Sequence, residues 1–178
     1  MIRLLFLFLF LPTFAFSQLD YHYKSSIDSF EVRIPQKPEV REITRYKIFS
    51  RNYKSYEVSE DWYFQYDISY TRNEDGTPVP KVSEKDLPTA MKNYLRGIIN
   101  STGRNCKELY SKRFKYNGVY PGMEYKISYS LEEFDFFKEG FFVLKSGKFI
   151  QASVTYLPNT KINILRKRYK LFISSFKF

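Results

Sequence analysis

Two stretches of this chain place large apolar side chains at every second position, which is the pattern of a β-strand with one buried face. The clearest stretch spans residues 61–70 and the other spans residues 123–129. Polar residues occupy most of the alternate positions. The expected inward-facing residues are Trp62, Phe64, Tyr66, Ile68 and Tyr70 in the first stretch and Met123, Tyr125, Ile127 and Tyr129 in the second. Any fold for this chain must therefore cover an aromatic-rich sheet.

Further strands are predicted on both sides of these two. Residues 29–34 alternate in the same way and end at two prolines, which favours an edge strand. Residues 41–50 and 110–116 are weaker strand candidates, residues 140–144 and 148–156 form a hairpin around a Ser-Gly turn, and residues 174–178 form a short closing strand.

Two segments change to the helical period. In residues 86–103 the apolar side chains share one helical face, Asp86 is a candidate N-cap, and Gly103 suits a left-handed closing residue. A second helix begins near Ile162 and ends near Phe172. The sequence thus predicts an α+β fold: a mostly antiparallel sheet covered by two helices, both packed on one side.

Residues 1–17 resemble a secretory signal peptide, with a basic start, an apolar run and small residues before the expected cleavage after Ser17. An uncleaved anchor is the alternative, but the apolar run is shorter than the roughly 20 residues that cross a bilayer. No cysteine lies at the cleavage point, so we expect no lipid. Residues 18–178 are then one exported domain, periplasmic or secreted, without a transmembrane segment, and we expect a monomer.

The composition excludes several kinds of site. With one Cys and one His, the chain has no intramolecular disulfide framework and no Cys/His zinc site. It also has no catalytic triad that needs a second histidine or a second cysteine. No phosphate-binding glycine loop or nucleophile elbow is present. The net charge of +10 favours an anionic partner. Export argues against nucleic acid as the physiological partner.

Three stretches carry a resemblance to a known family: FEVRIPQKPEV at 30–40, GVYPGMEYKISY at 118–129 and FISSFKF at 172–178. In this order they resemble the small exported PsbP-like domains, a fold shared with the Mog-type Ran-binding proteins and the DcrB lipoproteins. The resemblance implies an antiparallel sheet flanked by helices, no common cofactor, and accessory or binding roles. Because the chain lacks a lipidation cysteine and a photosynthetic context, we carry over no metal or photosystem role.

Three candidates for chemistry have ordinary structural alternatives. His22 lies near the expected N-terminus without a fixed partner, and Cys106 lies among basic residues that would lower a thiol pKa but has no nearby histidine. A buried structural thiol or a bond to a second chain are the other interpretations of Cys106. The third candidate is an acidic cluster formed by Glu132, Glu133, Asp135 and Glu139. It is either a solvated loop or the site of a hydrolase.

Basic residues form the remaining candidate site. Four belong to the second helix, off its apolar face, and three belong to the strand near residue 113. They would bind an anionic partner, or else form a solvated surface. The set is Arg166, Lys167, Arg168, Lys170, Lys112, Arg113 and Lys115.

These observations predict a protein that is not an enzyme, needs no cofactor or metal, and acts as an exported binding or accessory module of the bacterial envelope. Its partner would be an envelope protein or an anionic envelope component. The alternative is a periplasmic immunity or inhibitor protein that covers an acidic site. A hydrolase that uses the acidic cluster is a third hypothesis.

We predict that the exported form begins at Gln18 and carries no acyl group. The reason is that residues 1–17 have the basic, apolar and small-residue regions of a signal peptide in the usual order, and no cysteine lies at the cleavage point. Intact-mass measurement of the exported protein checks this. A retained leader or an added acyl mass would contradict it.

Overall fold

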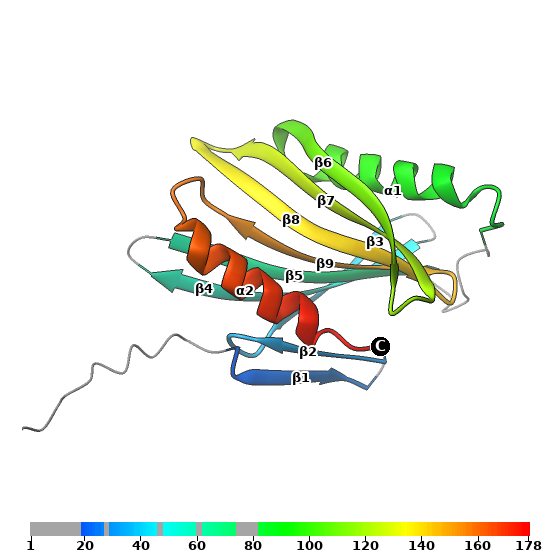
Figure 1. Ribbon diagram of the computed structural model, residues 1–178, viewed down its shortest axis with the longest axis horizontal. Coiled ribbons are helices and arrows are strands. Elements are labelled where there is room, and N and C mark those ends of the chain that lie inside the picture. The colour runs from blue at the N-terminus through cyan, green and yellow to red at the C-terminus, as the bar shows by residue number, and fades with distance from the viewer. Residues whose placement is uncertain (1–18, 27–28, 46–47, 60–61, 74–81) are drawn as a thin grey trace, which may run out of the picture.

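The computed structural model describes residues 19–26, 29–45, 48–59, 62–73 and 82–178 of the chain (Figure 1). The predicted leader and its cleavage point lie outside these residues. None of the helices in the described part of the chain has the length and apolarity that a membrane crossing requires.

Most of the chain forms one antiparallel sheet of seven strands. Its order across the sheet is β3-β4-β5-β9-β8-β7-β6, so each strand except the edge strands pairs on both sides. The predicted strands at 61–70 and 123–129 and the 140–156 hairpin are confirmed. The strands are β3 (Glu39–Arg45), β4 (Ile48–Ser59), β5 (Trp62–Asn73), β6 (Arg104–Tyr116), β7 (Tyr120–Leu131), β8 (Phe134–Lys145) and β9 (Lys148–Tyr156).

Strand β4 was not predicted over most of its length, because the side chains it buries are mainly polar. Arg51, Ser55 and Glu57 are buried on the same face as Tyr53. A search for alternating apolar residues does not detect such a strand. The sheet forms it nonetheless because both neighbours, β3 and β5, pair with it in continuous register.

The two helices, α1 (Leu87–Thr102) and α2 (Ile162–Ser175), cover opposite faces of the sheet (Figure 1). Leu165 and Phe172 of α2 pack on the face that carries Phe64. Leu95 and Ile98 of α1 pack instead on the other face. The expectation that both helices lie on one side is therefore wrong.

The cause lies in the central strands. Phe141 and Phe142 of β8 are both buried, and they point to opposite faces of the sheet. Met123 of β7 pairs with Phe142 and so faces α1. Each face of the sheet thus has an apolar surface that a helix must cover.

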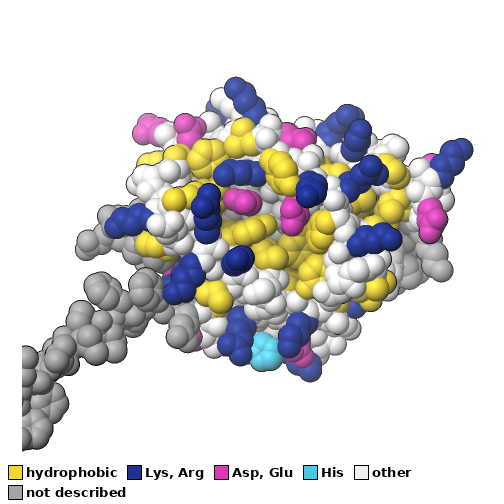
Figure 2. All heavy atoms as spheres, in the orientation of Figure 1, with side chains coloured by type: hydrophobic (Ala, Val, Ile, Leu, Met, Phe, Trp, Pro, Cys, Tyr) yellow, Lys and Arg dark blue, Asp and Glu magenta, His cyan; other side chains and the backbone are white. Residues whose placement is uncertain are grey.

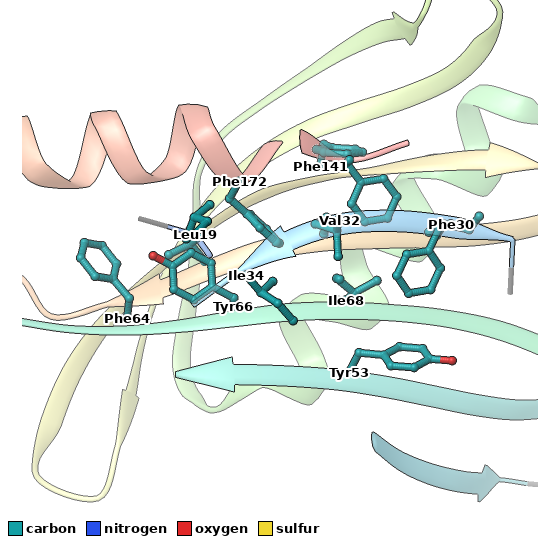
Figure 3. Close-up of a cluster of buried hydrophobic side chains, with 14 of the residues drawn as sticks. Leu19, Phe30, Val32, Ile34, Tyr53, Phe64, Tyr66, Ile68, Phe141 and Phe172 are labelled. Atoms are coloured by element: carbon teal, nitrogen blue, oxygen red, sulfur yellow. The ribbon is translucent and has the colours of Figure 1, made fainter. Parts of the chain in front are cut away.

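The face under α2 also holds a two-stranded ribbon, β1 (Tyr21–Ser25) and β2 (Phe30–Ile34). Figure 3 shows its side chains Phe30, Val32 and Ile34 among those of the sheet and α2. The Phe30 ring stacks on that of Phe176, with 5.4 Å between ring centroids. The predicted closing strand is not seen, since α2 extends to Ser175, and one bridge from Lys177 to Glu31 follows it.

Two details of α1 differ from expectation. The Asp86 side chain makes no capping hydrogen bond to the helix and instead accepts one from Ser83. Gly103 has a φ of 171°, which is extended rather than left-handed. A Cβ at this position would lie 2.7 Å from the Tyr129 ring, so glycine is required by close packing.

We predict that Phe64→Ala lowers the free energy of unfolding by about 3–5 kcal/mol, because Phe64 is fully buried beneath α2. Urea denaturation checks this, with Tyr63→Ala as the control. Tyr63 is the adjacent residue, lies on the other face and is only half-buried, so its truncation should cost less. A loss below about 1 kcal/mol for Phe64→Ala would mean that this face is open. The side chain of Trp62, which was expected on this face, lies outside the described residues.

Candidate basic binding surfaces

Helix α2 is attached to the sheet by a buried ion pair as well as by apolar contacts. The Arg168 guanidinium lies 2.8 Å from Glu57 of β4, and the Tyr66 hydroxyl donates a hydrogen bond to the same carboxylate at 2.7 Å. Burial, and then the negative charge of Glu57, raise the pKa of Tyr66 well above its usual range. Tyr66 therefore stays a neutral donor, and the three groups form one buried cluster.

Arg168 consequently does not belong to an exposed surface. It is only 5% exposed, and it shares the inner side of α2 with Leu165 and Phe172. The expectation that it lies off the apolar face is wrong, because the spacing of three and four residues places it between these two core positions. Sequence reasoning assigned it to the basic surface by residue type alone.

The other basic residues of α2, Arg166, Lys167 and Lys170, are exposed. They project from the side of the helix that faces away from the sheet. The first turn of α2 contains no acidic residue that would balance them. Figure 2 shows this face of the molecule, on which Lys and Arg side chains surround an apolar area with a few acidic side chains.

The strand residues of the candidate set lie on β6, at an edge of the sheet. Lys112 lies opposite Glu124 of β7 in the strand register, without an ion pair between the two side chains, and belongs to the face that carries α2. Arg113 and Lys115 belong to the opposite face, because side chains alternate along a strand. All three are exposed. Of the seven predicted residues, Arg168 is thus buried, three lie exposed on α2, and three lie exposed on β6. The three on β6 make both faces of this edge strand basic.

Most of the exposed candidates form no ion pair with a carboxylate. Within the described part of the chain this holds for Arg166, Lys170, Lys112, Arg113 and Lys115, as it does for other exposed cations such as Lys92 and Arg96. A different group of basic residues is in ion pairs, as in Lys24–Glu31 at 2.9 Å and Arg41–Glu39 at 2.6 Å. Further pairs are Arg51–Glu42, Lys54–Asp67, Lys126–Glu139, Lys138–Asp67 and Arg168–Glu57.

The acidic cluster does not assemble into a pair of carboxylates. Glu132 and Glu133 form the exposed turn between β7 and β8, and Asp135 accepts a hydrogen bond from Ser130 at 2.7 Å. Glu139 lies farther along β8, about 20 Å of extended chain from Glu133. Its carboxylate accepts a hydrogen bond from Tyr156 and lies 3.8 Å from Lys126.

The lone His and Cys have structural surroundings. His22 lies 3.3 Å from Glu31, on the outer side of the β1–β2 ribbon. Burial raises the pKa of the Cys106 thiol, contrary to the lowering expected from its basic neighbours in the sequence. In the described residues, no group of three or more His, Cys, Asp or Glu side chains is placed to hold a metal ion.

Sequence reasoning missed a polar cluster in the sheet face that carries α1. Asp67 of β5 accepts hydrogen bonds from Gln65 at 2.7 Å and from Lys138 of β8 at 3.0 Å. Burial disfavours the charged form of Lys138, but the attraction of the Asp67 carboxylate is the stronger effect. The pKa of Lys138 therefore lies above its usual value. The polar alternation of residues 63–69 was the available signal. The hydrogen bonds join the polar groups of this cluster to one another. We therefore interpret the cluster as structural, since it pairs opposite charges within the sheet.

We predict that Arg168→Met lowers the free energy of unfolding by about 3–5 kcal/mol, because the buried carboxylate of Glu57 then loses its cation. The matched variant Arg168→Met/Glu57→Leu/Tyr66→Phe removes all three polar groups and should lose less than the single variant. Chemical denaturation of both checks this. Equal losses would show that the ion pair matters only through the volume that Arg168 fills.

Comparison with known proteins shows the fold alone. No family profile matches the chain, and no curated protein matches it in sequence. Two solved structures are similar: protein PA94 of unknown function from Pseudomonas aeruginosa, and PsbP (CyanoP) from Synechocystis sp. PCC 6803. The first has a TM-score of 0.52 at 10% identity over 84% of this chain and 90% of its own. The second has a TM-score of 0.53 at 12% identity over 88% and 91%. The chain has the α+β fold of the PsbP-like proteins.

Proposed function

We propose that this protein is an exported, non-catalytic binding module of the bacterial envelope, and that its partner is an envelope protein or component with negative charge. The observation that supports this most directly is the set of exposed basic residues on α2 and β6 that have no carboxylate partner among the described residues. Such residues contribute little to folding and are free to attract an anion.

The position of these charges supports a specific surface. Arg166 and Lys170 extend from a helix that Leu165, Arg168 and Phe172 hold against the sheet. Their backbone therefore has a fixed orientation relative to the rest of the domain. A partner that meets them encounters charges whose backbone positions are already set, which reduces the entropy lost on binding.

In the described part of the chain, no hydrogen bond or ion pair joins the groups that could carry out catalysis. His22 contacts Glu31 on the β1–β2 ribbon, whereas Cys106 is on β6 and Glu133 is in the β7–β8 turn. General acid–base and nucleophilic mechanisms need such groups within hydrogen-bond reach. The lack of a direct contact between them supports binding over catalysis.

We predict that Arg166→Gln/Lys170→Gln slows association with an anionic probe by about three- to tenfold and flattens its salt dependence. Suitable probes are polyglutamate, a sulfated polysaccharide and vesicles that contain phosphatidylglycerol. The control is Lys24→Gln/Arg41→Gln, which also removes one Lys and one Arg, but from existing ion pairs. Stopped-flow kinetics at two salt concentrations compare the variants.

Circular dichroism confirms that both variants fold. If the two double variants slow association equally, net charge alone explains the binding and the α2 surface has no special part. If no probe binds the unmodified protein, the proposal of an anionic partner is wrong. A turnover that Glu133→Gln abolishes would overturn the non-catalytic assignment.

A further inference from the structure

Strand β6 presents a long edge that no strand of the described chain covers. It spans Arg104–Tyr116 and pairs only with β7. Figure 1 shows it at the margin of the sheet, beside α1. Leu109 and Tyr110 are 52% and 47% exposed, so neither α1 nor a described loop buries this part of the strand. One row of backbone donors and acceptors along an edge strand is available to another strand.

The two halves of β6 differ in regularity. Register shifts interrupt its pairing with β7 between Arg104 and Lys107 and again between Glu108 and Tyr110. From Tyr110 to Tyr116 the pairing continues without interruption. The Phe114 and Tyr116 rings lie 5.9 and 5.5 Å from that of Phe141, so the core holds this half in place. Residues 110–116 are therefore a regularly paired, anchored edge to which a strand can be added.

This regular half carries positive charge on both faces and no negative charge. Lys112 projects on the face of α2, whereas Arg113 and Lys115 project on the face of α1. A second copy of β6 placed along this edge would bring like charges opposite one another, which is unfavourable. A strand with acidic side chains would meet favourable charges on both of its faces. The same residues that oppose self-association therefore select an acidic partner.

The geometry points to residues 110–116 of β6 as a docking edge for an extended acidic segment of a partner protein, which is added to the sheet as an eighth strand. This inference rests on the proposed function, because it specifies how one kind of anionic partner is bound. Backbone hydrogen bonds would supply affinity, and the cations on the two faces would supply selectivity.

The opposite edge of the sheet serves as an internal control. Strand β3 contains Glu39, Arg41, Glu42 and Arg45, so its charges cancel. An acidic strand gains nothing from charge at that edge. Protection from hydrogen exchange should therefore appear in β6 and not in β3.

The test uses a fluorescent peptide of alternating Glu and Thr and a second peptide with the same side chains but with every backbone amide N-methylated. Both keep the carboxylates, but only the first can donate hydrogen bonds to a strand edge. Fluorescence anisotropy with the mature protein should give at least tenfold tighter binding for the first peptide. Amides within residues 110–116 should exchange about tenfold more slowly when that peptide is bound.

Protein variants identify the charges involved. Lys112→Gln/Arg113→Gln/Lys115→Gln should weaken binding of the unmodified peptide about tenfold. Arg166→Gln/Lys167→Gln/Lys170→Gln removes the same number of charges from α2 and should have a smaller effect. Circular dichroism confirms that each variant folds.

Equal binding of the two peptides would overturn the inference, because charge alone would then account for the affinity, while the proposed function would stand. Protection in β3 instead of β6 would also overturn it. Binding of anionic vesicles or polysaccharide but not of the peptide would refute the edge and leave an anionic partner. Failure of all the anionic probes would refute both proposals.

Discussion

The central strands of the sheet are buried on both faces, and the rest of the architecture depends on this constraint. Every residue from Ile150 to Tyr156 of β9 is buried, and consecutive residues of β8 point apolar rings to opposite sides. One helix can cover only one face. Because α1 and α2 each contribute a single apolar side, the sheet lies between them. In the described part of the chain, the two sheet edges and the outer sides of the helices are among the positions that stay open to another molecule.

The sequence predicted the elements whose apolar pattern is regular and missed those whose pattern is not. The strand at Trp62–Asn73 and the α1 helix have such patterns, and the structure confirms them. Strand β4 was missed because it buries Arg51 and Glu57. Periodicity also cannot say which face of a doubly buried sheet a helix covers, since both faces are apolar. That choice depends on register, which long-range pairing determines.

The candidate site shows the same limit at the level of single residues. Composition correctly indicated an excess of positive charge, but residue type could not separate Arg168, which pairs in the core, from Arg166, which faces solvent. The structure separates the two by their contacts. Arg168 and Lys138 pair with Glu57 and Asp67 inside the fold. Arg166, Lys170 and the cations of β6 are exposed where another molecule can reach them, and the proposed binding role rests on them.

The stacking of Phe30 on Phe176 has a consequence for the order in which the parts of the chain fold. The backbone of Arg33 donates a hydrogen bond to Ser175 across a separation of 142 residues, and the rings of Phe176 and Phe178 close on aromatic residues of β2, β6 and β7. The ribbon of β1 and β2 therefore packs on a segment that lies far from it in the sequence. Contacts of such long separation form slowly, because a long loop must close first, so we expect the ribbon to reach its native position late in folding.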